Sequence, residues 1–311
     1  MDIPLTIHLT IPPEDDGRPL LDIVAAALGG RDAAMELIAR GGLWADGTRA
    51  RDGAAPARAG SELAIQRPLS GMYPEIAVTA AQILYEDDDL IALDKPAGAY
   101  VDSTPWDAEG NLHAALGHFL AARDGEAPPL HLAHRLDRDT TGVLLCSKNP
   151  AVNPALHRSF AHGLAHKEYL CICMSAPLEE TFTVETGHGR SAHGRFRVYP
   201  IEEVGRALPG IAQRTPRVKP MRTRFAVERR LKDAALVRAF PETGRTHQIR
   251  LHLAHLGHPL LGDVKYGGPA EWRGRALPYH LLHAERLLLP HPRTGAPLEI
   301  IGPAPEWAQW E

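Results

Sequence analysis

Cysteine is scarce in this chain, whose 311 residues include only Cys146, Cys171 and Cys173. A number this small and odd argues against a disulfide framework and favours a reducing compartment. Cys171 and Cys173 stand two residues apart in the apolar stretch YLCICM, so on a strand their side chains share one face. We interpret this pair as core thiols, with a metal-binding or redox pair as the alternative.

Long apolar runs and a secretory leader are also absent from the sequence. No run approaches the roughly 18 residues of a membrane-spanning helix. The N-terminal stretch MDIPLTIHLTIPPEDD lacks a basic start followed by an apolar core and a cleavage site. We therefore expect a cytoplasmic protein without a membrane partner. Its 44% hydrophobic and 23% charged residues suit one large or two moderate domains.

Charge is unevenly distributed along the chain. The formal net charge is −4, yet residues 186–255 carry 15 Lys/Arg against 5 Asp/Glu, whereas residues 1–66 carry 6 against 10. The local excess of positive charge in the middle of the chain is what contacts with nucleic-acid phosphates require. A solvated, arginine-rich surface is the alternative interpretation.

Residues 18–65 have the pattern of a small α+β unit. The stretches RPLLDIVAAAL and AAMELIARGGL have helical spacing, and WADGTRA and AGSELAI read as short strands around turns. This pattern resembles an S4-type RNA-binding domain, which implies a domain over residues 1–66 that presents a basic face to RNA. The resemblance rests on the segments LIARGGLWADG and AGSEL and on Arg18, Leu21 and Asp22. The acidic balance of this region leaves open a scaffold that only packs against its neighbour.

The proline-containing connector RPLSGMYPEIAV predicts a linker over residues 67–78, followed by a second domain over residues 79–311. Most apolar runs of this second region read as strands, and its helical stretches do not alternate regularly with them. We therefore expect an α+β fold with a mixed, largely antiparallel sheet. The clearest helices are NPALHRSFAHG and THQIRLHLAHLG, the latter with Thr246 as its expected cap and Gly257 as its stop.

The stretch HRLDRDTTG at residues 134–142 concentrates charge immediately before the apolar run VLLC. The turn DRDTTG places Asp137 on a loop that enters a buried strand, where a carboxylate serves as a nucleophile or as a salt-bridge partner. This stretch resembles the signature H-R-L-D-x-x-T-S-G of the RluA-type pseudouridine synthases. Three more segments agree in order with that family: LDKPAG at 93–98, HKEYLCIC at 166–173, and GRTHQIRLHLAHLGHPLLGDVKYGG at 244–268.

The resemblance implies an RNA pseudouridine synthase that isomerises uridines in structured ribosomal or transfer RNA. The reaction has no net redox change and transfers no group, so no cofactor is expected. Two features depart from the family pattern: Thr141 stands where serine is usual, and residues 200–218 read as an insertion. The former is conservative in chemistry, and the latter bears on substrate choice more than on reaction class.

The resemblance also implies roles for three catalytic residues. Asp137 corresponds to the carboxylate that acts on the base or on ribose C1′, or stabilises a cationic sugar. Because burial raises the pKa of a carboxylate, a nearby cation has to keep it ionised. By resemblance that cation is Arg250, with a phosphate contact as the alternative. Tyr169 corresponds to the tyrosine that lies against the flipped base and assists proton movement at C5, although a strand tyrosine also serves as core.

Three further residues are implied to contact the substrate. Arg135 corresponds to the residue that extrudes the base or fills its place, and a phosphate contact is the alternative. Lys95 is expected to shape the floor of the pocket rather than to act in the chemistry. Ile249 is an apolar contact for the base or a core residue.

The histidine cluster of the fourth segment invites a metal-site interpretation. On a helix, His252 and His255 are spaced to share a metal, but no carboxylate or cysteine completes a ligand set, so we expect no metal. Two other functions are weighed against the isomerase: a non-catalytic RNA-binding assembly factor and a metal-dependent hydrolase. We expect a monomer, since no exposed stripe along a predicted helix indicates an interface with a partner.

Overall fold

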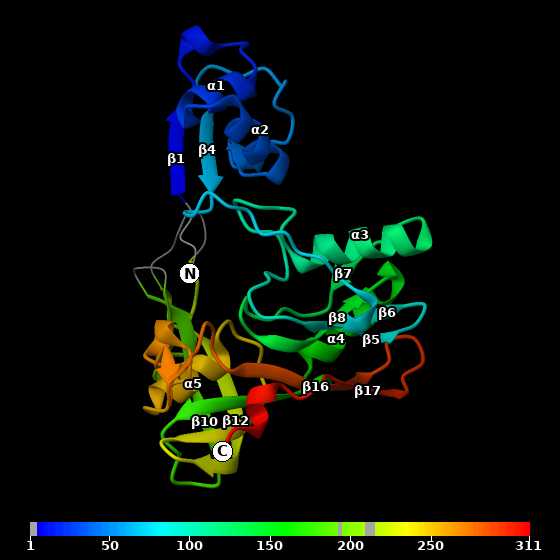
Figure 1. Cartoon of the computed structure of the whole chain (residues 1–311), viewed down its shortest axis with the longest axis vertical. Helices are drawn as coiled ribbons and strands as arrows, with labels where there is room; N and C mark the ends of the chain where they lie inside the picture. Colours follow the sequence, from blue (N-terminus) through cyan, green and yellow to red (C-terminus); the bar gives the residue numbers. More distant parts are fainter. Residues whose placement is uncertain (1–4, 192–194, 209–214) are drawn as a thin grey trace. The chain divides into compact units, whose positions relative to one another are not determined.

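A computed structural model describes residues 5–191, 195–208 and 215–311 (Figure 1). The chain forms two compact units. Residues 1–79 and 99–128 make up the N-terminal unit, and residues 80–98 and 129–311 make up the large-sheet unit. No helix in the described ranges has the length and apolar character needed to cross a membrane.

The N-terminal unit packs two helices against a four-stranded antiparallel sheet, close to the pattern expected from its sequence. Helix α1 (Leu20–Leu28) ends at Gly29 and α2 (Arg31–Arg40) ends at Gly41, both glycines having positive φ. The buried faces of the helices meet the apolar side of the sheet in one core cluster. In spatial order the strands are β1 (Leu5–Thr10), β4 (Glu62–Arg67), β2 (Leu43–Ala45) and β3 (Thr48–Arg49).

Residues 99–128 leave the large-sheet unit and join the N-terminal one. They include helix α3 (Leu112–Asp124), which Asn111 caps by accepting a hydrogen bond from the Ala114 N–H. The segment is held by the hairpin β2–β3, where Trp44 Nε1 donates to the Pro105 carbonyl at 2.7 Å and Arg49 Nη2 donates to the Thr104 carbonyl at 2.6 Å. The predicted division into residues 1–66, 67–78 and 79–311 differs from the observed grouping in one segment. This excursion, residues 99–128, belongs to the N-terminal unit although it lies within the predicted second domain.

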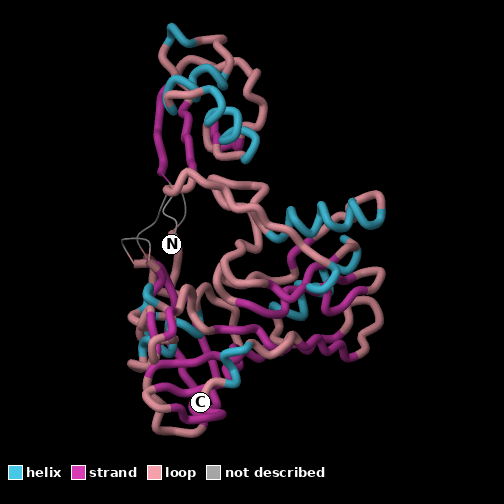
Figure 2. The backbone as a smooth tube through the Cα atoms, in the orientation of Figure 1, coloured by secondary structure: helices cyan, strands magenta, loops and turns pink. Residues whose placement is uncertain are grey.

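The large-sheet unit is dominated by strands, as Figure 2 shows. Within the described residues its sheet has eleven strands, and the one parallel pair among them is β8 with β16, where Thr141 lies opposite His283. The expected mixed, largely antiparallel sheet is confirmed. In spatial order the strands are β11 (Phe196–Tyr199), β10 (Thr181–Arg190), β12 (Lys219–Leu231), β13 (Ala234–Pro241), β9 (His166–Met174), β16 (Leu282–Pro290), β8 (Thr141–Ser147), β6 (Leu90–Lys95) and β5 (Ile83–Glu86).

Smaller elements complete the unit. Strand β17 (Pro297–Ile301) pairs with β16, β7 (His131–Leu132) pairs with β8, and β14 (Glu271–Trp272) forms a separate hairpin with β15 (Arg275–Ala276). Residues 209–214, part of the insertion expected over 200–218, lie outside the described residues. The short 3-10 helices of this unit are η2 (Ala80–Gln82), η3 (Pro150–Val152), η4 (Ile201–Glu203), η5 (Val264–Tyr266) and η6 (Glu306–Gln309), whereas η1 (Pro13–Asp15) belongs to the N-terminal unit.

One core cluster of this unit lies where strands β9, β13 and β16 pack against helix α5 (Gln248–His255). Cys171 and Cys173 are fully buried in this cluster, as the interpretation of core thiols requires. Cys171 Sγ donates to the Val237 carbonyl at 3.4 Å, and burial raises the pKa of the Cys173 thiol to about 12. Both groups are therefore un-ionised and unreactive at neutral pH.

The two expected helices of this unit are present, as α4 (Asn153–Ala161) and α5, but α5 starts later than expected. Thr246 is not its cap. His247 occupies the N-cap position with φ 59°, and its side chain makes no capping hydrogen bond. Instead, the Gln248 side-chain oxygen accepts from the Arg245 N–H at 3.0 Å. The helix ends at His255, and Gly257 follows with positive φ.

Candidate active site

Asp137 lies on the loop between β7 and β8, and buried polar contacts fix this loop. Lys95, at the end of β6, donates from Nζ to the Arg138 carbonyl at 2.6 Å and to the Pro96 carbonyl at 2.8 Å. Thr140 Oγ1 is hydrogen-bonded to His280 Nε2 at 2.9 Å. Because these contacts fix the loop immediately after Asp137, the backbone of that residue has little freedom to move.

The end of the HRLDRDTTG stretch needs glycine for a steric reason. Gly142 has φ 101°, and a Cβ at this position would lie 2.2 Å from the Ala284 carbonyl oxygen of the neighbouring strand β16. At the start of the stretch, the His134 ring accepts a hydrogen bond from the Leu145 N–H at 3.2 Å. The outer residues of the motif thus hold the loop, and the inner ones present the carboxylate.

Arg250 joins the Asp137 carboxylate to a second, more deeply buried carboxylate. Its Nη1 donates to Asp137 Oδ2 at 3.0 Å, while Nε and Nη2 donate to Asp263 Oδ2 and Oδ1 at 2.7 and 2.8 Å. The side chains of Asp137, Arg250 and Asp263 are 21%, 8% and 1% exposed. A guanidinium held in a two-pronged contact by one carboxylate cannot rotate freely, so its third nitrogen stays directed at Asp137.

Electrostatics keep Asp137 ionised in this setting. Burial alone would raise its pKa, but the positive charges of His247, Arg250 and His280 and the hydrogen bond from Arg250 hold it below the ordinary value of 3.8. Burial lowers the pKa of both His247 and His280 to about 4, so these rings are neutral at pH 7. Arg250 is therefore the cation that acts on Asp137 at neutral pH, and its own pKa is raised by Asp263 and Asp137 despite burial.

The predicted catalytic residues Asp137, Tyr169 and Arg250 come together in the large-sheet unit. Tyr169 lies on β9, buried in the same core cluster that receives α5. Burial, with a smaller effect of the Asp137 charge, raises the pKa of its hydroxyl. Among the described residues this hydroxyl has no hydrogen-bonding partner. The hydroxyl is thus available to form a hydrogen bond with a substrate, although the ring is packed in the core.

The predicted substrate-binding residues fall into different environments. Lys95 is 1% exposed and holds the Asp137 loop, and burial lowers its pKa to about 7. Arg135 is exposed on the same loop, two residues before Asp137. Ile249 is 5% exposed and packs within the core cluster, with Leu136 packed against that cluster. Its role as a contact for the base stays a prediction, and its packing favours the core interpretation.

The sequence interpretation missed three residues of this site. Asp263 and Tyr266 belong to the segment GDVKYGG, which was recognised as a motif without roles for its members. His247 faces the other carboxylate oxygen, its Nε2 lying 3.9 Å from Asp137 Oδ1, and its Nδ1 is 2.6 Å from the Tyr266 hydroxyl. Arg250 also lies over the Tyr266 ring at 5.1 Å from its centroid. A charged residue in a quoted motif was the signal that could have identified Asp263.

His252 of α5 and His258 in the turn after the helix have structural partners. His252 is fully buried between the Thr186 and Thr223 hydroxyls, at 3.1 and 2.9 Å, and burial lowers its pKa to about 3. His258 Nδ1 lies 3.3 Å from the Met174 carbonyl. Within the described ranges, no group of three or more His, Cys, Asp or Glu side chains is arranged to hold a metal ion.

Comparison with known proteins identifies this arrangement. A sequence model of the RNA pseudouridylate synthase family matches residues 89–255. RNA pseudouridine synthase 1 of Oryza sativa subsp. japonica is 37% identical over 288 residues, which cover 80% of each chain. Ribosomal large subunit pseudouridine synthase C of Yersinia pestis is 35% identical over 248 residues, which cover 76% of this chain and 69% of the relative.

A solved structure supports the same conclusion. Human RNA Pseudouridylate Synthase Domain Containing 1 matches with a TM-score of 0.55 and 26% identity, covering 74% of this chain and 87% of the human one. The fold and the sequence matches define an RNA-modifying isomerase. The chain belongs to the RNA pseudouridine synthase family, and the expected resemblance to RluA-type members is confirmed. It forms pseudouridine in RNA, which sets aside the assembly-factor and hydrolase alternatives.

Proposed function

We propose that Asp137 is the carboxylate that carries the isomerisation of uridine, with Arg250 keeping it ionised. The observation that supports this most directly is the buried chain of contacts in which Arg250 bonds Asp137 at 3.0 Å while Asp263 holds the other two nitrogens. A carboxylate that is partly exposed, ionised and fixed on a constrained loop suits attack on an electron-poor carbon. Asp137 acts on ribose C1′ or on the uracil ring.

The reaction requires four changes in bonding and no net change of oxidation state. The bond from N1 of uracil to C1′ breaks, the freed base turns over, and a bond forms between C5 and C1′. The hydrogen at C5 then leaves as a proton, while N1 acquires one. Because every step moves only protons and bonds that the substrate itself supplies, we propose that no cofactor takes part.

Tyr169 is proposed to lie against the flipped base and to assist removal of the C5 proton. Its hydroxyl lacks a partner among the described residues, which leaves it available to a substrate. The raised pKa means that the group is neutral at pH 7, so it donates or relays a proton rather than acting as a phenolate.

The remaining predicted residues support the substrate and the loop. Arg135 is proposed to extrude the target base, which its exposed position next to the Asp137 segment permits. Lys95 is proposed to shape the pocket by holding the backbone at Arg138, in line with its hydrogen bonds. Ile249 is proposed to contribute through packing in the same core cluster as Tyr169 more than through direct contact with the base.

The substrate is proposed to be a uridine in structured ribosomal or transfer RNA. The name of the bacterial relative, a ribosomal large subunit pseudouridine synthase, favours ribosomal RNA. We further propose that residues 1–66 act as an S4-like RNA-binding domain, that 67–78 link it to the catalytic region 79–311, and that residues 186–255 contact phosphates. The protein is proposed to act in the cytoplasm as a monomer.

Release of tritium from RNA labelled at uracil C5 tests this proposal. The label is lost only when C5 exchanges its hydrogen for the sugar, so release measures isomerisation directly. Ribosomal and transfer RNA fractions from a strain that lacks the protein are incubated separately with the purified full chain. Release from one fraction identifies the substrate class, whereas no release from either would refute the proposed choice of RNA.

A further inference from the structure

The helices of the N-terminal unit offer little free positive charge to RNA. Arg31 pairs with Asp22 at 2.6 Å, and Arg18 pairs with Asp15. Asp32 lies in the first turn of α2, and residues 1–66 carry four more acidic than basic groups. Phosphate binding by the helix pair is therefore electrostatically unfavourable.

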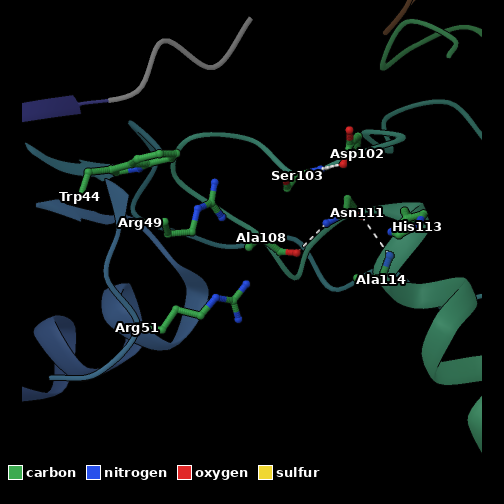
Figure 3. A pocket seen from close by; sticks show the side chains of 9 residues that line it. All are labelled: Trp44, Arg49, Arg51, Asp102, Ser103, Ala108, Asn111, His113 and Ala114. Atoms are coloured by element: carbon green, nitrogen blue, oxygen red, sulfur yellow. Dashed lines mark hydrogen bonds between the residues drawn. The ribbon is translucent and has the colours of Figure 1, made fainter. Parts of the chain in front are cut away.

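A pocket elsewhere in the same unit is different in character. It has a volume of about 400 Å³ and lies between the hairpin β2–β3 and the excursion that precedes α3 (Figure 3). Figure 3 shows the guanidinium groups of Arg49 and Arg51 on one side of this pocket and Asp102 on the other. The remaining lining residues are Trp44, Ser103, Ala108, Asn111, His113 and Ala114.

One N–H donor group of Arg49 has no acceptor among the described residues. Its guanidinium lies over the Trp44 ring, 4.8 Å from the centroid, and Nη2 donates to the Thr104 carbonyl. Nη1 is buried and has no hydrogen-bond partner among the described residues. A buried donor without an acceptor costs about 1–3 kcal/mol, so an anion in the pocket would supply what this nitrogen lacks.

Arg51 is held only loosely. Its side chain is 52% exposed and pairs with Glu109, which is 35% exposed, at 2.7 Å. Exposed ion pairs contribute little net free energy, so a phosphate can displace Glu109 at small cost. Asp102 would repel phosphate, and its carboxylate can accept hydrogen bonds from ribose hydroxyls, so a bound nucleotide would lie with its phosphate at the arginine side.

We propose that this pocket binds a backbone phosphate of the RNA substrate, with Arg49 and Arg51 as its ligands. The site is formed jointly by the S4-like sheet and by the excursion at residues 99–128, part of the region that matches the family model. The proposal rests on the proposed function, because it names a second contact for the same RNA. It assigns phosphate binding in this unit to the hairpin and not to the helices.

Binding of a fluorescent oligouridylate to the full chain, measured by anisotropy over a range of salt concentrations, tests the pocket. The test variant is Arg51→Gln, whose side chain is mostly in solvent. The matched control is Arg31→Gln, which removes an exposed arginine from an ion pair in the same unit. We expect Arg51→Gln to raise Kd roughly fivefold, equivalent to about 1 kcal/mol, and to reduce the slope of log Kd against log salt by about one.

Arg31→Gln is expected to change neither quantity, and equal effects of the two substitutions would overturn the proposal. A second variant, Arg49→Lys, keeps the charge but loses the forked donor, and it should weaken binding without changing the salt slope. Competition by uridine monophosphate at the concentration of the labelled RNA would indicate a site for free nucleotides and would contradict the assignment to the RNA backbone. Tritium release by the wild type on labelled RNA is measured in parallel, so a failure of the proposed function is seen separately.

Discussion

Replacing Arg250 with methionine removes the cation on which two carboxylates depend. The methionine side chain would keep much of the length and the apolar stem of the arginine but none of its three hydrogen bonds to Asp137 and Asp263. Since Asp263 is 1% exposed, water cannot take the place of the guanidinium. Removing one partner of a buried ion pair costs about 3–5 kcal/mol, and we expect Arg250→Met to lower the free energy of unfolding by about that amount at pH 7.

The loss should depend on pH in a defined direction. In the wild type the pKa of Asp137 is lowered, so its favourable contribution is fully present above the ordinary value of 3.8 and is lost only as pH falls through the lower folded value. In Arg250→Met, the lowering effect of the guanidinium is lost while burial remains, so this pKa would rise. Ionised Asp137 then destabilises the fold at neutral pH, and the penalty shrinks as pH falls and the group is protonated. The acid limb of the activity profile should move to higher pH for the same reason.

Urea unfolding at several pH values measures these effects, with Arg222→Met as the control. Arg222 also lies between two carboxylates, Glu185 and Glu242, but all three side chains are about half exposed, so its loss should cost less than about 1 kcal/mol. Adding Asp137→Asn to Arg250→Met should restore about 1 kcal/mol or more. Equal losses for the two arginine variants, or no recovery in the double variant, would refute the reasoning.

Two further substitutions test other parts of the site. Tyr169→Phe should reduce kcat by about 100-fold or more. It should change the free energy of unfolding by less than about 0.5 kcal/mol, because the described residues give the hydroxyl no partner. An unchanged rate of tritium release in a single-turnover assay would leave Tyr169 as a core residue only. Gly142→Ala should lower the free energy of unfolding by about 3 kcal/mol or more, because the added Cβ meets the Ala284 carbonyl. The control is Gly163→Ala, since Gly163 also has positive φ but has open space around it. In the same thermal or urea unfolding assay this control should cost about 1 kcal/mol.

The fold class could be predicted because it depends on local patterns, whereas the central pair of the site, Asp137 and Arg250, was predicted from the resemblance of their motifs to those of the RluA-type family. Alternating apolar residues identify strands whatever their partners. The motif around Asp137 is a short continuous stretch, and the loop that it forms is held by Lys95 and requires Gly142. The motif around Arg250 likewise lies on one helix. Both motifs can be recognised in the sequence without knowledge of the tertiary structure.

Contacts between segments that are distant in the sequence could not be predicted from such patterns. The excursion at residues 99–128 joins the N-terminal unit largely through backbone carbonyls, such as those of Thr104 and Pro105, which any sequence provides. The start of α5 at Gln248 rather than Thr246 follows from the left-handed backbone of His247, which residue propensities do not predict. Asp263 was not identified, because its function depends on reaching Arg250 across a turn.

Single-turnover release of tritium from RNA labelled at uracil C5, compared between wild type, Asp137→Asn and Asp139→Asn, tests the central claim most directly. Asp139 lies on the same loop and pairs only with its neighbour Arg138 among the ion pairs described, so its variant controls for charge and loop integrity. The account predicts release by wild type and by Asp139→Asn, and none by a folded Asp137→Asn protein. Release by Asp137→Asn at the wild-type rate would show that another group carries the chemistry.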